Sequence, residues 1–127
     1  MKSKATLANK AKAPAATPRV GQPVRGSRSG RPIMVALDLL GRRAALRVLW
    51  ELRGEALTFR ALQEAAGSNP ALLNTRLKEL RDAGLVDHAE GGYHLTAAGR
   101  GLIDALQPLS AWAQSWGRAA ARRGAPL

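Results

Sequence analysis

Residues 57–86 read LTFRALQEAAGSNPALLNTRLKELRDAGLV and carry two helical patterns separated by a short turn. Thr58 is suited to cap the first helix and Gly67 to end it, because threonine accepts a first-turn amide and glycine adopts the left-handed conformation that follows many helices. Asn69 is a good cap for the second helix, and Pro70 fits its first position, where an amide would lack a helical partner anyway. The stretch therefore predicts a helix–turn–helix unit.

The second of these helices, predicted over 70–82, separates an apolar stripe from a polar face. Leu73, Leu77 and Leu80 form the stripe at helical spacing. The opposite face carries Ala71, Asn74, Thr75, Lys78 and Asp82. A helix in a major groove presents such groups to the DNA, so Asn74 is a candidate for adenine, Thr75 for a thymine methyl or a phosphate, and Lys78 for guanine or a phosphate. The alternative is that these side chains are only solvated.

Further elements lie on both sides of this unit. Apolar residues at helical spacing predict one helix over about 33–40 and another over about 45–52. Downstream, residues 85–88 and 93–96 are short strand-like runs around Glu90-Gly91-Gly92, a composition typical of a tight hairpin. The predicted order is four helices, a hairpin and a final helix.

The final helix is predicted over 97–117, with Thr96 as its cap. Its apolar residues repeat at alternating spacings of four and three, which favours packing against a partner helix. They are Leu102, Leu106, Leu109, Ala113 and Trp116, with Ile103 and Trp112 widening the stripe. Pro108 lies inside the helix and is expected to kink it. The stripe could instead cover the domain's own core, but a helix about 30 Å long overruns so small a core, so we expect both roles.

The composition excludes several classes of protein. The chain has 127 residues, no cysteine, and 20 Lys and Arg against 9 Asp and Glu, for a net charge of +11. Without cysteine there is no disulfide scaffold, zinc ribbon, thiol nucleophile or thiol switch. No apolar run approaches the roughly 20 residues of a membrane span, and no signal peptide is recognisable, so a cytoplasmic protein is expected. The charge points to an anionic partner, most simply nucleic acid.

The excess charge belongs to the two ends of the chain. Residues 1–32 hold eight basic residues and residues 118–127 hold three, both without an acid, whereas the charges of 33–117 balance. Because residues 1–32 are rich in Ala, Pro, Gly and Ser without an apolar period, they predict a disordered basic arm before the folded domain 33–117 and the basic tail 118–127. The arm is expected to bind DNA phosphates; a solubilising leader and an organelle transit peptide are the alternatives.

The sequence also carries a family resemblance. ALDLLGRRAALRVLWEL (36–52), the 57–86 stretch and YHLTAAGRGL (93–102) resemble the HxlR-type family of bacterial transcriptional regulators. The most specific parts are Leu-x-x-Arg-Leu-x-x-Leu-x-x-x-Gly-Leu-Val at 73–86 and Tyr-x-Leu-Thr-x-x-Gly at 93–99. The resemblance implies a mainly α (α+β) fold, a winged helix-turn-helix with a two-stranded wing and a C-terminal dimerisation helix.

The resemblance further implies a homodimer on an operator, with helix 70–82 in the recognition role and helix 58–66 as its partner. Together with the polar face it gives the candidate DNA contacts Thr58, Arg60, Asn69, Pro70, Asn74, Thr75, Arg76, Lys78, Arg81 and Arg100. Arg76 lies beside the leucine stripe, so we expect it partly buried against an acid or a phosphate. The candidate dimer contacts are Leu102, Leu106, Leu109, Trp112, Ala113 and Trp116.

The chain departs from the family pattern in two places. Many members carry a cysteine near the start of the domain, and its absence here excludes a thiol mechanism. The predicted wing carries Asp87 and Glu90 in place of basic residues, which argues against minor-groove contact by the wing. His88 and His94 are diagonal in the predicted hairpin and are expected to be solvated rather than to bind metal.

The leading hypothesis is a sequence-specific, homodimeric repressor that binds double-stranded DNA. No Gly-rich phosphate loop, Ser-His-Asp set or carboxylate pair stands out, so no enzyme, metal or cofactor is predicted, and no effector is identified. The alternative is an architectural, nucleoid-associated protein that binds DNA mainly through its basic tails. A third hypothesis is a winged helix used only for protein–protein contact.

Overall fold

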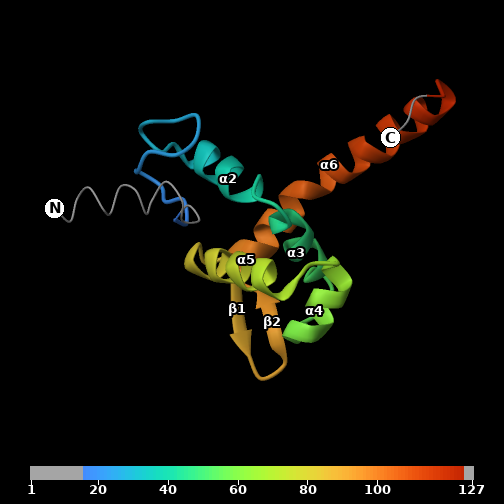
Figure 1. The fold of residues 1–127 in the computed structure, drawn as a ribbon. Helices are drawn as coiled ribbons and strands as arrows, with labels where there is room; N and C mark the ends of the chain where they lie inside the picture. Colours follow the sequence, from blue (N-terminus) through green and yellow to red (C-terminus); the bar gives the residue numbers. More distant parts are fainter. Residues whose placement is uncertain (1–15, 125–127) are drawn as a thin grey trace.

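The computed structural model describes residues 16–124. Its elements are α2 (Pro32–Leu40), α3 (Ala45–Glu51), α4 (Phe59–Ala66), α5 (Pro70–Asp82), β1 (Val86–Ala89), β2 (Gly92–Leu95) and α6 (Ala97–Arg122). Helices α3, α4 and α5 gather beside the β1–β2 hairpin, whereas α2 and the far half of α6 leave this body in different directions (Figure 1). Among the described residues, no helix combines the length and the hydropathy that a membrane crossing requires.

The helix–turn–helix unit forms as its capping residues predict. Thr58 Oγ1 accepts the amide of Ala61 at 3.2 Å, and α4 ends at Gly67, which adopts the left-handed conformation. Asn69 Oδ1 accepts the amide of Leu72 at 2.8 Å, with proline at the start of α5. These local signals fix where α5 begins and ends, and therefore which of its side chains face outward.

The hairpin is a two-stranded antiparallel wing. Val86 pairs with Leu95 and Ala89 with Gly92, so the loop between the strands is two residues long. Leu57 and Tyr93 exchange two backbone hydrogen bonds of 2.9 and 2.8 Å, which attach the wing to the segment before α4. The wing is thereby held in a fixed place beside the helix–turn–helix unit.

The core lies where α3, α4, α5, the wing and the first half of α6 meet. Helix α3 is central to it and contacts α2, α4, α5 and α6. The buried side chains of this cluster are Leu39, Val48, Leu49, Leu52, Leu62, Leu73, Leu77, Leu80, Val86, Leu95 and Ile103. The leucine stripe predicted for α5 is part of this core, so its opposite face is free to point outward.

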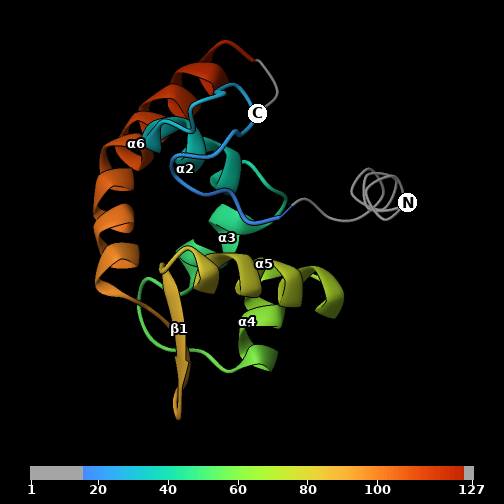
Figure 2. The same cartoon turned by 90° about the vertical axis from the view of Figure 1, so that its left-hand side faces the viewer.

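Helix α6 is longer than predicted and runs from Ala97 to Arg122, five residues into the predicted basic tail. Residues 118–122 read RAAAR, all strong helix formers, and the helix ends only before Gly124, which has a φ of +72°. Pro108 lies within α6, which continues through it and curves along its length in Figure 2. Thr96 caps α6 by accepting the amide of Gly99, as predicted.

The segment 16–31 differs from the disordered arm that its composition predicts. It has no helix or strand, but it closes on itself, since the amide of Gly21 donates to the carbonyl of Gly30 at 3.0 Å. It is also tied to the domain, where Thr17 Oγ1 donates to Asp82 and Arg42 donates to the carbonyl of Ala16. Hydrogen bonds to polar groups of the domain thus help to hold a segment that has few apolar residues. The rest of the predicted arm, 1–15, lies outside the described residues.

Candidate nucleic-acid interface

The outward face of α5 presents the polar side chains that the sequence singles out. Asn74 and Lys78 are exposed and one helical turn apart, and Thr75 beside them is half-buried. Within residues 16–124, neither Asn74 nor Lys78 has a hydrogen-bond or ion-pair partner. Their polar groups are therefore available to an external ligand.

A groove of about 610 Å³ separates α5 from the wing. It is lined by Asn74, Leu77, Lys78, Arg81, Asp82, Gly84, Val86, Asp87, Tyr93 and Thr96. The structure thus brings three of the predicted contacts, Asn74, Lys78 and Arg81, to one wall of a common surface. Tyr93 on the wing lines the same groove and was not among the residues predicted from the sequence. Its place in a short strand of the predicted hairpin, opposite His88, is the one signal that marks it as a wing residue.

The charges of this groove nearly cancel. Lys78 and Arg81 are opposed by Asp82 and Asp87, which line the same groove. Arg81 approaches Asp87 of the wing to 4.0 Å, with about half of each side chain exposed. An exposed pair of this kind contributes little to stability, so Arg81 can exchange Asp87 for a phosphate at small cost.

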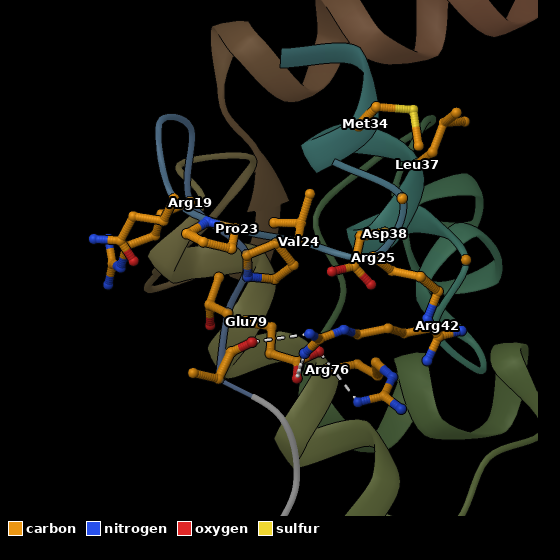
Figure 3. A pocket seen from close by; sticks show the side chains of 16 residues that line it. Arg19, Pro23, Val24, Arg25, Met34, Leu37, Asp38, Arg42, Arg76 and Glu79 are labelled. Carbon is orange, nitrogen blue, oxygen red and sulfur yellow. Dashed lines mark hydrogen bonds and ion pairs between the residues drawn. The ribbon is translucent and has the colours of Figure 1, made fainter. Parts of the chain in front are cut away.

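Arg76 is directed into the protein rather than toward the open face. Its Nη1 lies 3.1 Å from Glu79 Oε1, and its Nε donates to the carbonyl of Arg43 at 2.7 Å. Glu79 Oε2 lies 2.6 Å from Arg42 Nη1, and the side chains of Glu79, Arg42 and Arg76 are only 7%, 13% and 14% exposed. These three residues form a charge cluster that fastens α5 to the turn between α2 and α3 (Figure 3).

The burial of Glu79 was not predicted from the sequence. The sequence does contain a signal, because Arg76 and Glu79 lie three residues apart along the flank of the leucine stripe, where a partly buried ion pair fits. The position of Arg42, far away in the chain, could not be read from that spacing.

The remaining candidate contacts lie around α5 without entering its groove. Asn69 and Thr58 use their side-chain oxygens for capping, and Pro70 is exposed at the first turn of α5. Arg60 is almost fully exposed on α4 and only 4.0 Å from Glu64, and Arg100 is exposed near the start of α6. None of these residues lines the groove between α5 and the wing.

The candidate dimer contacts on α6 separate into two groups. Leu102 and Leu106 are partly buried against the domain's own core. Leu109, Trp112 and Trp116 are 54%, 58% and 48% exposed, and Ala113 between them is exposed as well. The two indole rings stack with centroids 5.6 Å apart, so the far half of α6 carries a preformed apolar face.

Neither histidine of the wing lies in a metal-binding arrangement. The His88 ring contacts Tyr93, with centroids 4.5 Å apart. His94 lies opposite Asp87 in the register of the two strands. Among residues 16–124, no three potential ligands lie close enough together to hold a metal ion.

A helix–turn–helix followed by a two-stranded wing and a long helix defines the winged helix-turn-helix class of DNA-binding domains, and α5 is the second helix of its helix–turn–helix unit. The model of the HxlR-like helix-turn-helix family matches residues 39–121. The chain belongs to this family.

Solved structures of regulators resemble the chain. The quinone-bound YodB of B. subtilis is 28% identical over 66% of this chain and 96% of that one, with a TM-score of 0.62. A possible HxlR family transcriptional factor of Thermoplasma volcanium is 27% identical over 65% and 82%, with a TM-score of 0.59. A regulator of the MarR family from Enterococcus faecalis is 26% identical over 80% and 99%, with a TM-score of 0.63. No curated protein matches the sequence.

The family and these structures make the chain a DNA-binding transcriptional regulator. It is not an enzyme, because the proteins it groups with act in transcriptional control.

Proposed function

We propose that the chain is a sequence-specific, homodimeric repressor that reads the major groove of its operator with α5. The observation that carries this proposal is the pair Asn74 and Lys78, exposed on α5 beside the wing and without partners among the described residues. An amide and an ammonium group one turn apart on such a helix match the donors and acceptors of base edges and phosphates.

The position of each candidate residue suggests its role in DNA binding. Asn74 reads a base and Thr75 contacts a thymine methyl or a phosphate, while Lys78 holds guanine or a phosphate. Asn69, Pro70, Thr58 and Arg60 lie at or near helix N-termini, where backbone amides favour phosphate. Arg81 and Arg100 supply cations toward the DNA backbone, whereas Arg76 positions α5 through Glu79 and makes no DNA contact of its own.

The second copy of the chain is proposed to cover the far half of α6. Leu109, Trp112 and Trp116 expose a large apolar face that a monomer would leave in water. Ile33 on α2 is 61% exposed and is a further apolar side chain that a partner would cover. A symmetric pair of α6 helices would present two copies of α5 to a palindromic site.

Repression is proposed because the described chain carries no folded module besides the winged helix. A protein of this kind regulates most simply by occupying an operator and excluding the transcription machinery. A reporter gene controlled by the operator should become more active when the regulator is deleted, and a loss of reporter activity would instead indicate an activator.

Selection of bound sites from random duplexes by the full chain tests the proposal. Enrichment of a palindrome, with half-sites about one helical turn or a multiple apart, is the expected result. Unselective binding would support an architectural role on the bacterial nucleoid, which the near-neutral groove and the acidic wing favour. Absence of DNA binding would contradict both, and would support a domain used for protein contact alone.

A further inference from the structure

A second cavity, of about 940 Å³, lies between the segment 16–26 and the elements α2 and α5. Its size is within the roughly 300–1,000 Å³ of small-molecule sites. It is separate from the groove between α5 and the wing, since the two cavities share no lining residue.

One wall of the cavity belongs to the loop 16–31, which is held in shape by its own hydrogen bonds. The amide of Gly21 closes it onto the carbonyl of Gly30, and Val24 and Ser27 exchange hydrogen bonds of 2.8 and 3.0 Å across its tip. Gly30 is required there, because a Cβ atom at this position would lie 2.2 Å from the carbonyl oxygen of Gln22. Ser27 Oγ accepts the amides of Gly30 and Arg31, which fixes the loop to the start of α2.

The cavity combines apolar walls with an excess of positive charge. Its apolar lining comes from Pro18, Pro23, Val24, Met34 and Leu37. Four arginines line it, Arg19, Arg25, Arg42 and Arg76, against two acids, Asp38 and Glu79. In the view of Figure 3, Pro23 and Val24 lie between Arg19 on one side and Arg25 and Asp38 on the other, above the cluster of Glu79 with Arg42 and Arg76.

The floor of the cavity is connected to α5. Arg42 donates to Glu79 of α5 at 2.6 Å and to the carbonyl of Ala16 at 2.8 Å, so one guanidinium joins the loop segment to α5. Thr17 donates to Asp82 at the end of the same helix. An anion attracted to Arg42 would compete with Glu79 and with the Ala16 carbonyl, and would loosen both connections.

We propose that this cavity is an effector site for a small organic anion with an apolar body, and that its occupation weakens DNA binding. The anionic group pairs with the arginines, and the apolar body fills the space between the loop and α2. The regulatory half of the proposal rests on the proposed function, whereas the binding half is independent of DNA.

The binding half is tested by calorimetry of the full chain with 2-naphthoate, and with uncharged 2-naphthamide as the matched ligand. Arg19→Ala/Arg25→Ala should lower the affinity for 2-naphthoate at least about tenfold, and 2-naphthamide should bind the wild type equally poorly. Arg28→Ala/Arg31→Ala removes the same charge from the same loop outside the cavity and should leave the affinity unchanged. Equal affinity of both double variants for 2-naphthoate would overturn the site. So would an NMR titration in which the largest shifts of backbone amides lie around Trp112 and Trp116.

The regulatory half is tested on the selected duplex. Saturating 2-naphthoate should weaken DNA binding by the wild type at least about fivefold and leave Arg19→Ala/Arg25→Ala unaffected at the same concentration. Unchanged DNA affinity with 2-naphthoate bound would overturn the regulatory half. If the chain binds no DNA at all, the proposed function fails while the calorimetric result stands.

Discussion

Glu79 holds a negative charge in the interior of the domain between two arginines. Arg42 and Arg76 each contact one of its carboxylate oxygens, at 2.6 and 3.1 Å. Arg76 fits the family's arginine position in the 73–86 motif, and the structure gives that position a physical role. It holds α5 against the α2–α3 turn and leaves the outward face to other residues.

Replacing Glu79 by glutamine should destabilise the fold, because two mostly buried guanidinium groups lose their counter-charge. Loss of one member of a buried ion cluster costs about 3–5 kcal/mol, measurable by urea unfolding. Glu64→Gln is the matched control, since Glu64 is 76% exposed and 4.0 Å from Arg60, and should change stability by less than about 0.5 kcal/mol. Equal stability of the two variants would show that the buried cluster does not hold the fold.

Asn74 and Lys78 are expected to contribute to DNA binding in different ways. Asn74→Ala should cost about 1–3 kcal/mol on the selected operator and almost nothing on a random duplex, because a base contact is lost. Lys78→Ala should weaken both duplexes alike if Lys78 holds a phosphate. Fluorescence anisotropy with both duplexes measures the two effects. Equal losses on both duplexes for both variants would mean that neither residue reads a base.

At the scale of elements, one glycine sets how α6 joins the wing. A Cβ atom at Gly99 would lie 2.2 Å from the carbonyl oxygen of Leu85, whereas Gly101, two residues later on the same helix, has open space around it. Gly99→Ala should therefore destabilise the domain by about 1–3 kcal/mol, and Gly101→Ala should stabilise it by about 0.5–1 kcal/mol. Thermal unfolding compares the two, and similar shifts in Tm would contradict this close approach.

The exposed half of α6 should control assembly. Trp112→Lys/Trp116→Lys should yield a folded monomer of about 13.5 kDa, because the two rings are half exposed and outside the core. Gln114→Lys, on the opposite face of the same helix, should leave the proposed dimer intact. Sedimentation equilibrium gives the masses, and a dimer of Trp112→Lys/Trp116→Lys would exclude this face as the interface.

The elements whose ends carry local signals could be predicted from the sequence. Thr58, Asn69 and Thr96 each cap a helix through their own side chains, so spacing alone located α4, α5 and the start of α6. The end of α6 was missed because 118–122 continue the helix with alanine and arginine, whose charge suggested a tail. The contacts of 16–31 were missed because they depend on Arg42 and Asp82, which are distant in the chain.

At the scale of the whole molecule, the net charge of +11 comes from the two ends of the chain, because the basic and acidic residues of 33–117 are equal in number. The groove between α5 and the wing is itself nearly neutral. Long-range attraction to DNA is therefore expected to come from the tails, and discrimination between sequences from α5.

Deleting residues 1–15, which hold four lysines and no acid, should flatten the salt dependence of DNA binding. Each phosphate neutralised contributes about −0.9 to the slope of log K against log salt, so a loss of several units per dimer is expected. Residues 16–31 are retained because they contact the folded domain. The ratio of operator to random affinity should stay nearly constant, and an unchanged slope would make the arm a solvated leader.

Specific recognition by α5 is tested most directly by the ratio of the full chain's affinities for the selected operator and for a random duplex, at one salt concentration. Specific regulators bind their sites about 10³–10⁷ times more tightly than other DNA. We predict a ratio of at least about 10³ for the wild type, falling about tenfold or more in Asn74→Ala. A wild-type ratio near one would contradict sequence reading by α5 and leave only unselective binding through the basic tails.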